Sequence, residues 1–339
     1  MLVRNGGSVG FETATSALVE NNVVVLSGGY DVNGTPNIPS GVSTVGLTID
    51  NATFSSDTLA ILSGGATVTT STGPTVFGNN LDIYAGADSF IQAINGNTLS
   101  IGGTLTANVD KFGTTAQTTG NLLRFSASGN STLTVGGNVF LSAQAFGAGT
   151  NVDGTNAGNA TGGTVIVQTG SGSTIGINGA LNINVDGYGG GHNGLNGAAG
   201  NGTGGIAQIL ANGGSGSMVT VGGPVTVSAT GRGGSSGECA SCQITGGNGT
   251  GGAATGGYAS ISFSGAASSI DLIGSSQFDA NATGGSGLNG GAATGGWVNL
   301  QAGSNGTLTA AFLGASANAL GGNGQVGGAA TGGRAILLR

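Results

Sequence analysis

The stretch 161–169 reads Thr-Gly-Gly-Thr-Val-Ile-Val-Gln-Thr, a Thr-Gly-Gly triplet followed directly by a short segment in which apolar residues alternate with others. Thr-Gly-Gly followed by such an apolar segment recurs at 161–163, 203–205, 255–257, 294–296 and 331–333, so these copies start 42, 52, 39 and 37 residues apart. Self-similarity at such a period is typical of repeat proteins. One unit of this size cannot bury its own apolar face, so the units must stack, and the sequence predicts a solenoid.

Apolar residues after each triplet alternate with polar ones, which places them on one face of a strand. In the first strand the equivalent inward positions are Val165, Val167 and Thr169; Ala207, Ile209 and Ala211; Ala259, Ile261 and Phe263; Val298, Leu300 and Ala302; and Ala335 and Leu337. A second strand follows a turn, and a third follows a glycine bend, as in Ile175 and Ile177 and then Leu181, Ile183 and Val185. We therefore predict an all-β fold, a parallel β-solenoid with three short strands per coil.

The rest of each copy is rich in glycine, at 187–205, 231–257, 284–296 and 321–333. These loops leave the coil after the third strand, so we expect them to stack along one ridge. That ridge is our hypothesis for a lateral contact or binding surface. The sequence leaves open whether the loops are packed or mobile, because glycine-rich polar segments bury little apolar area.

The strand pattern also extends towards the N-terminus without the triplet. Residues 1–85 are less regular and lack long glycine loops, whereas residues 86–339 repeat regularly. We interpret the two parts as irregular and regular coils of one continuous solenoid.

Composition excludes several classes of protein. Glycine accounts for 76 of 339 residues, but no Gly-X-Y period is present, so the chain is not collagen. The formal net charge is −7 with only 6 Lys plus Arg, so no basic stripe exists to neutralise phosphates, and we expect no nucleic-acid partner. No apolar run approaches the roughly 20 residues of a spanning helix, so we expect no membrane insertion.

The two ends carry weak information about context. The start, Met1 to Gly7, lacks the apolar region of a signal peptide. The chain stops just after opening a new strand at 335–338, which suggests a fragment of a longer protein or a coil completed by a partner.

Cys239 and Cys242 form a Cys-x-x-Cys in the longest glycine loop. We favour a local disulfide, because an isolated pair in a chain with little cysteine suits an exported protein. Two free thiols are the next interpretation. A redox or metal site ranks last, because structural zinc needs four ligands and the single histidine, His192, lies in another loop.

The remaining polar residues do not form a catalytic pattern. His192 is interpreted as an exposed loop histidine without a nucleophile around it. Glycosidase chemistry needs two carboxyl groups within about 5–10 Å, and only Asp82 with Asp88, or Asp271 with Asp279, could approach across coils. Glycine-rich segments such as 284–289 lack the aspartate of calcium-binding repeats. We expect no enzyme activity, no metal and no cofactor.

Tyr258 and Trp297 are the best candidates for ligand contact. Both stand first after Thr-Gly-Gly, while their following neighbours, Ala259 and Val298, should face inward. The two aromatic rings should therefore face out or cap the corner. They could hold a sugar ring, although packing at the corner is the favoured interpretation.

The repeats resemble those of large bacterial surface adhesins, namely filamentous-haemagglutinin-like and autotransporter-passenger proteins. The resemblance lies in units such as 96–107, Gly-Asn-Thr-Leu-Ser-Ile-Gly-Gly-Thr-Leu-Thr-Ala, and 130–143, Asn-Ser-Thr-Leu-Thr-Val-Gly-Gly-Asn-Val-Phe-Leu-Ser-Ala. The resemblance implies a right-handed parallel β-helix that is displayed at the cell surface or secreted and has an adhesive or scaffolding function. The recurrent Gly-Gly-Ala-Ala-Thr-Gly-Gly at 251–257, 290–296 and 327–333 departs from the family pattern and leaves a specialised fibre open.

The leading functional hypothesis is a structural or adhesive segment of an extracellular fibre, either part of a large adhesin or a subunit of a filament. It implies self-association, head to tail or laterally through the glycine-rich loops, and host or matrix glycans as partners. The alternative is a carbohydrate-binding or carbohydrate-cleaving β-helix such as a phage tail spike. Ice binding by ladders of Thr-x-Thr ranks last. The pattern occurs at Thr104–Thr106 and Thr132–Thr134, but Ile175–Ile177 is expected to break the ladder.

Overall fold

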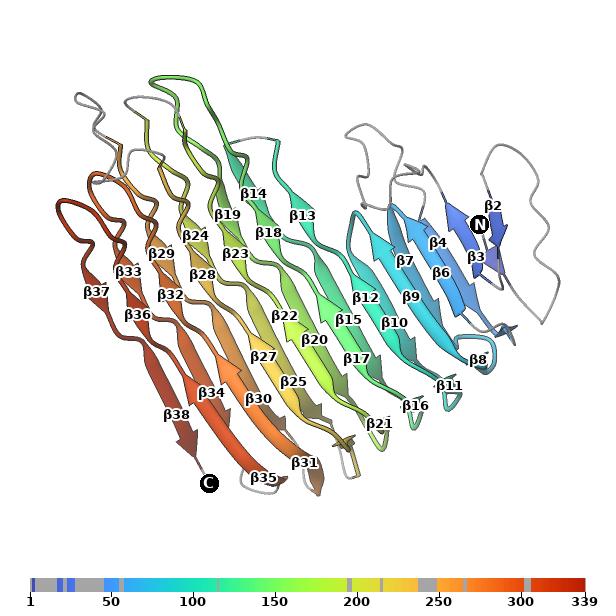
Figure 1. Ribbon diagram of the computed structural model, residues 1–339. Coiled ribbons are helices and arrows are strands. Elements are labelled where there is room, and N and C mark those ends of the chain that lie inside the picture. The colour runs from blue at the N-terminus through green and yellow to red at the C-terminus, as the bar shows by residue number, and fades with distance from the viewer. Residues whose placement is uncertain are drawn as a thin grey trace.

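The computed structural model describes residues 2–3, 17–20, 23–27, 46–54, 58–114, 116–193, 197–213, 216–236, 249–264, 267–301 and 306–338. The regular elements of these residues are all strands, and they stack from the N-terminal to the C-terminal end of the molecule (Figure 1). Strand pairing is parallel apart from the antiparallel pair β2–β3. The described residues contain no helix that is long and apolar enough to span a membrane.

Sheet A receives one strand from each coil. Its strands are β1 (Leu2–Val3), β4 (Gly46–Asp50), β7 (Gly65–Thr69), β10 (Ser89–Ala93), β15 (Leu122–Ala127), β20 (Thr164–Thr169), β25 (Ile206–Asn212), β30 (Tyr258–Ser264), β34 (Trp297–Gln301) and β38 (Arg334–Leu338). Val165 pairs with Ala207, which pairs with Ala259. The predicted alignment of the repeat copies is therefore confirmed.

Sheet B has two flanks, which we name B1 and B2. Flank B1 contains β5 (Thr53–Phe54), β8 (Thr75–Phe77), β11 (Thr98–Ile101), β16 (Thr132–Val135), β21 (Thr174–Ile177) and β26 (Met218–Val221). Flank B2 contains β2 (Ala17–Glu20), β3 (Val23–Ser27), β6 (Thr58–Ser63), β9 (Asn80–Ala85), β12 (Leu105–Asn108), β17 (Val139–Ser142), β22 (Leu181–Asn184) and β27 (Val225–Ser228). The long strand β31 (Ser268–Asp279) pairs with both β26 and β27, and β35 (Gly306–Ser316) pairs with β31.

The core lies between sheet A and the two flanks of sheet B. In one coil Ile209 comes from sheet A, Val219 from flank B1 and Val227 from flank B2, and each is at most 1% exposed. The buried residues of successive coils form one continuous cluster. Burying each such side chain stabilises the fold by about 1.5–3 kcal/mol. Ile175 and Ile177 belong to this cluster, so they do not interrupt an outward ladder of threonines, contrary to our expectation.

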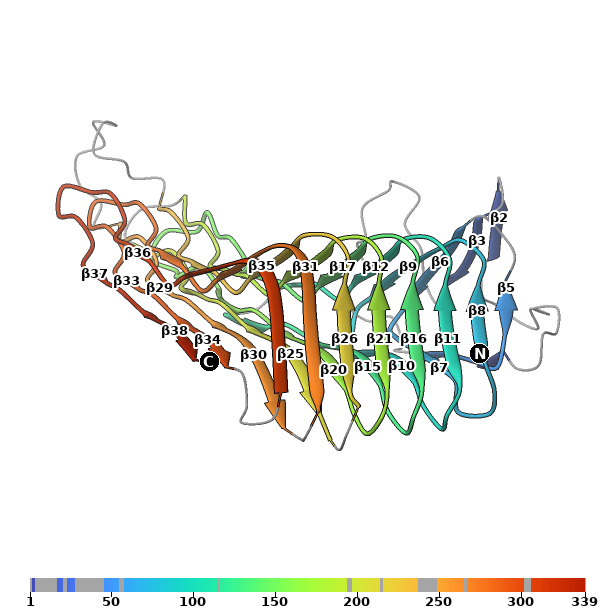
Figure 2. The ribbon, with the colours of Figure 1, turned by 90° about the horizontal axis from the view of Figure 1, so that it is seen from below.

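The glycine-rich segments build a second layered unit, which we name the glycine wing. Its sheet C contains β13 (Lys111–Phe112), β18 (Ala145–Phe146), β23 (Gly187–Tyr188), β28 (Gly231–Arg232), β32 (Ala282–Thr283) and β36 (Ala319–Leu320). Its sheet D contains β14 (Gln117–Thr119), β19 (Asn159–Thr161), β24 (Gly202–Thr203), β29 (Ala254–Thr255), β33 (Ala293–Thr294) and β37 (Ala330–Thr331). Figure 2 shows the wing extending from the coils on the side away from strands β11, β16, β21 and β26. In the described residues, the glycine segments are therefore ordered and stacked.

Hydrogen bonds between the two layers hold the wing together. The Gly190 N–H donates to the Gly158 carbonyl at 2.9 Å, and the Gly200 N–H donates to the Gly190 carbonyl at 2.8 Å. The same zigzag continues through the later coils, with donors Gly234, Gly252, Gly285, Gly291, Gly322 and Gly328. Backbone groups of the interior are thus satisfied without side chains.

The two glycines of the repeated triplet are required by close backbone approach. A Cβ on Gly256 would fall between the Ala280 carbonyl oxygen and the Gly296 nitrogen. Those two groups form a hydrogen bond of 2.7 Å between the layers. A Cβ on Gly257 would meet the backbone of Gly205 in the preceding coil. Only glycine lets the layers approach this closely.

Candidate functional site

The two aromatic residues singled out in the sequence lie side by side on the outer face of sheet A. Tyr258 pairs with Trp297, and their ring centroids are 5.6 Å apart at an interplanar angle of 78°. The guanidinium carbon of Arg334 lies 5.8 Å from the centre of the Trp297 ring. Because the rings are nearly perpendicular and an arginine covers one of them, they do not form a flat platform for a sugar chain. Their use in ligand contact stays a prediction.

The cysteine pair, Cys239 and Cys242, lies outside the described residues. His192 is fully buried, so the interpretation as an exposed loop histidine is wrong. The reason is the wing: His192 forms parallel bridges with Thr150 and Ser236 of the adjacent coils, and its ring packs beside Gly197. Among the described residues, no three His, Cys, Asp or Glu side chains form a group that could hold a metal ion.

The candidate acid pairs are distributed over separate faces. Asp82 lies in flank B2, whereas Asp88 precedes sheet A and accepts a hydrogen bond from the Leu122 N–H at 2.8 Å. Asp271 lies in the half of β31 that pairs with flank B1, and Asp279 lies in the half that pairs with flank B2. Neither pair flanks a common site.

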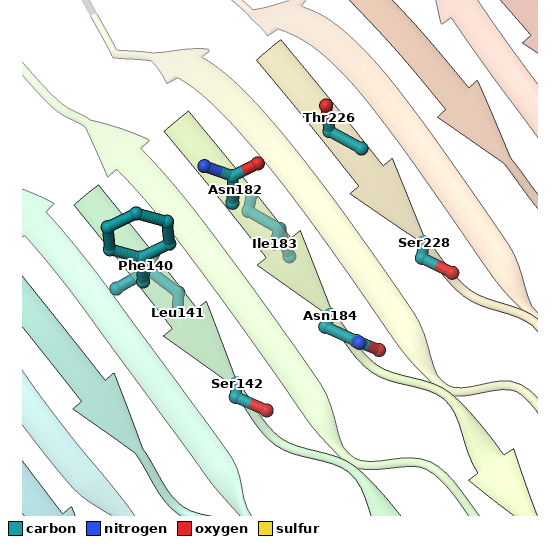
Figure 3. Close-up of a pocket in the computed structure, with 8 residues that line it drawn as sticks. All are labelled: Phe140, Leu141, Ser142, Asn182, Ile183, Asn184, Thr226 and Ser228. Atoms are coloured by element: carbon teal, nitrogen blue, oxygen red, sulfur yellow. The ribbon is translucent and has the colours of Figure 1, made fainter. Parts of the chain in front are cut away.

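A shallow hollow opens on the outer face of flank B2. It has a volume of about 360 Å³ and is lined by residues of β17, β22 and β27, drawn in Figure 3: Phe140, Leu141, Ser142, Asn182, Ile183, Asn184, Thr226 and Ser228. Phe140 pairs with Asn182, which pairs with Thr226, so these three side chains form one row across the strands. Phe140 is 41% exposed. Among the described residues the Asn182 amide has no hydrogen-bond partner, so it is available to a ligand.

Ser142, Asn184 and Ser228 form a second row of the hollow, and the serines of this row belong to a structural network of hydrogen bonds. Ser228 Oγ donates to Asp186 Oδ1 at 2.6 Å, and the Thr230 N–H donates to the same oxygen at 2.7 Å. Asp110 accepts the equivalent bonds from Ser142 and Gln144 two coils earlier. Asn281 accepts them from Ser316 and Asn318 two coils later. These side chains fix the corner where flank B2 turns into sheet C, and they orient the floor of the hollow.

An aromatic stack continues the same face onto sheet C. The rings of Phe112 and Phe146 are 4.7 Å apart at 7°, and those of Phe146 and Tyr188 are 4.9 Å apart at 4°. The guanidinium carbon of Arg232 lies 5.5 Å from the centre of the Tyr188 ring. The inner faces of the rings cover one another, so the stack presents mainly ring edges, together with the outer face of Phe112, which is 60% exposed.

Comparison with known proteins finds no matching family model, curated protein or solved structure.

Neither the hollow nor the aromatic stack could be recognised in the sequence. Tyr188 lies in the predicted glycine-rich loop 187–205, and Phe112 and Phe146 lie outside the strands predicted from the sequence, so their common register was hidden. The corner network had a detectable signal, because Asn108-Val-Asp110 and Asn184-Val-Asp186 occupy equivalent positions.

Alkaline pH should destabilise the corner at Tyr188. Burial, together with the nearby Asp186 carboxylate, raises the pKa of the Tyr188 phenol from its ordinary 10.0 to about 12. Between about pH 10 and pH 12 the folded chain therefore binds more protons than the unfolded chain, so the free energy of unfolding falls as pH rises through this window. We expect Tyr188→Phe to reduce this fall. Denaturant unfolding from pH 9 to pH 12 measures it, and an identical pH dependence in both proteins would contradict the assignment.

Proposed function

We propose that the chain is a segment of an extracellular fibre at a bacterial cell surface, of the adhesin kind that its repeats resemble. In this proposal the coils form a right-handed parallel β-helix, with three long strands per turn in addition to the short strands of the wing. Right-handedness is the nearly universal hand of crossover connections between parallel strands. The proposed activity is binding of host or matrix glycans in the hollow on flank B2.

The row Phe140, Asn182 and Thr226 carries this proposal. Pockets that bind small polar molecules combine apolar or aromatic surface with a few placed polar groups. Phe140 supplies an exposed aromatic side chain, Asn182 an amide with both donor and acceptor, and Thr226 a hydroxyl. A sugar ring offers matching CH and OH groups. The row stands on paired strands above a buried core, so it is held rigidly without a ligand.

The pairing of the coils and the composition of the chain are those expected of a rod-shaped extracellular protein. Successive coils are joined by parallel strand pairing through sheets A to D. The chain has 6 Lys plus Arg in 339 residues, which leaves few sites for trypsin-like proteases. Low charge and continuous pairing fit a durable fibre outside the cell.

Self-association forms part of the proposal. Successive coils pair through parallel strands in all four sheets, so one chain could extend another coil by coil with the same pairing. Contacts of this head-to-tail type grow filaments when they repeat. Lateral contact through the glycine wing is the second route.

Binding to immobilised polysaccharides tests the glycan site. We expect the full chain to bind at least one member of a varied panel, and Phe140→Ala and Asn182→Ala each to raise the Kd by about 10-fold, the effect of losing roughly 1 kcal/mol or slightly more. Phe312→Ala and Asn299→Ala are matched controls, because they remove an outward phenylalanine and an outward asparagine elsewhere. No binding by the wild-type chain, or equal losses in the controls, would overturn the site.

Electron microscopy of the purified chain tests the fibre. We expect rods, either single or joined end to end. Compact particles without an elongated axis would contradict the fibre and leave the glycan result to be judged on its own.

A further inference from the structure

The outer face of sheet D carries an uninterrupted row of threonines. Six consecutive strands place their threonine in the same register: Thr119, Thr161, Thr203, Thr255, Thr294 and Thr331. These side chains are half-buried or exposed, while the alternate alanines Ala160, Ala254 and Ala293 are at most 3% exposed. The threonines of the repeated triplet therefore all point to solvent.

Internal packing accounts for the identity of the residues beside these threonines, but it does not account for the presence of threonine at every position of the row. The glycines are needed where the layers touch, and the alanines fill the narrow interior. The asparagine oxygens of Asn159 and Asn201 accept hydrogen bonds from the next coil at 2.8 Å. In contrast, within the described residues no hydroxyl of the threonine row has a hydrogen-bond partner. The position three residues after each triplet threonine is likewise half-buried or exposed, yet it varies: Thr164, Ile206, Tyr258, Trp297 and Arg334. A function of the molecular surface is therefore the remaining reason why threonine does not vary at these positions.

The face is uncharged and rigidly supported. Beside the threonines runs a second outward row made of Gln117, Asn159, Asn201, Ala253, Ala292 and Ala329. Towards the C-terminal end this leaves an Ala-x-Thr surface without a charged side chain. The cross-layer hydrogen bonds of the glycine wing lie directly beneath it and fix the spacing of the strands.

The dimensions of the face argue against a protein partner. Six strands spaced about 4.8 Å apart, each contributing about three residues of 3.3 Å, give an area of roughly 300 Å². Stable interfaces bury about 800 Å² per partner and contain protruding anchor residues. The two rows contain no aromatic ring and no arginine, so a glycan or protein would find no anchor.

We propose that this threonine row binds the surface of an ice crystal. A crystal needs no anchor, because it presents regularly spaced water molecules to a regularly spaced surface. Each threonine offers a hydroxyl that bonds to water and a methyl group that restricts the orientation of the water around it. Repetition at the strand spacing then orders a water layer that can join the lattice. Flank B1 lacks this continuity, because Met218, Gly176 and Asp271 interrupt its outward rows.

Thermal hysteresis and inhibition of ice recrystallisation by the full chain test the proposal. We expect both activities in the wild-type chain and their loss in Thr255→Tyr and Thr294→Tyr, which place a bulky ring in the middle of the row. Thr132→Tyr and Thr134→Tyr on flank B1 are the matched controls and should keep full activity. Circular dichroism and thermal unfolding should be unchanged in all four variants, because each replaced side chain faces outward.

Three results would overturn the proposal. These are a wild-type chain without effect on ice, activity that survives both sheet D substitutions, and activity that is lost equally in the flank B1 controls. If the sheet D variants instead abolish self-association or polysaccharide binding and the wild-type chain leaves ice growth unchanged, the row serves a partner and not ice.

Discussion

Replacing Gly256 by alanine should open the glycine wing, while the same replacement at Gly332 should leave stability almost unchanged. Both glycines stand first after the threonine of their triplet. A Cβ at Gly256 would enter the hydrogen bond between the Gly296 N–H and the Ala280 carbonyl, and both groups are backbone atoms that cannot rotate away. A Cβ at Gly332 meets nothing within 4 Å.

The expected cost at Gly256 has two parts. Forcing a methyl group into a packed interior destabilises a protein by about 1–3 kcal/mol. Leaving a buried N–H and carbonyl unpaired adds about 1–3 kcal/mol. The sum is a large fraction of the stability of a typical domain, about 5–15 kcal/mol.

Hydrogen exchange is the appropriate measurement, because a repeat protein opens locally before it unfolds as a whole. Peptides that contain Gly257 and Gly296 should exchange much faster in Gly256→Ala and at the wild-type rate in Gly332→Ala. Unchanged protection in Gly256→Ala would mean that the two layers are not in the close contact described here.

Strand positions and register could be predicted from the sequence because side chains carry the signal. Val165, Val167 and their equivalents alternate with polar residues, and this period of two identifies both the strand and its inward face. Sheets C and D could not be predicted in the same way. Glycine has no side chain, so a strand such as β23 shows no alternation, and its order depends on contacts with neighbouring coils.

The functional surfaces were less predictable, for related reasons. The position of Tyr258 beside Trp297 followed directly from the triplet spacing. Phe140, in contrast, has no equivalent in the adjacent coils, because Thr106 and Asn182 occupy the same position there, so no repeat drew attention to it. The threonine row was visible as part of the triplet. Only the layered wing shows that it is exposed and that its hydroxyls have no internal role.

Two phenylalanines of one coil should separate stability from binding. Phe125 lies in sheet A, is fully buried and pairs with Ile91 and Val167. Phe140 lies in flank B2 of the same coil with 41% of its surface exposed. We expect Phe125→Ala to lower the free energy of unfolding by about 3–5 kcal/mol, the usual cost of removing a buried aromatic ring and leaving a cavity.

Phe140→Ala should change the free energy of unfolding by less than about 1 kcal/mol, because an exposed ring loses little when it is removed. Its effect should appear in polysaccharide binding. Phe125→Ala, at a temperature that keeps it folded, should bind polysaccharide as the wild type does.

Denaturant unfolding and the binding assay, applied to both variants, give four values. The proposed roles require stability to fall in the first variant and affinity to fall in the second. A large loss of stability in Phe140→Ala would instead make that ring part of the fold and would leave the hollow without its aromatic contact. A loss of affinity in folded Phe125→Ala would show that the geometry of the hollow depends on the packing beneath sheet A, since Phe125 itself cannot reach a ligand on flank B2.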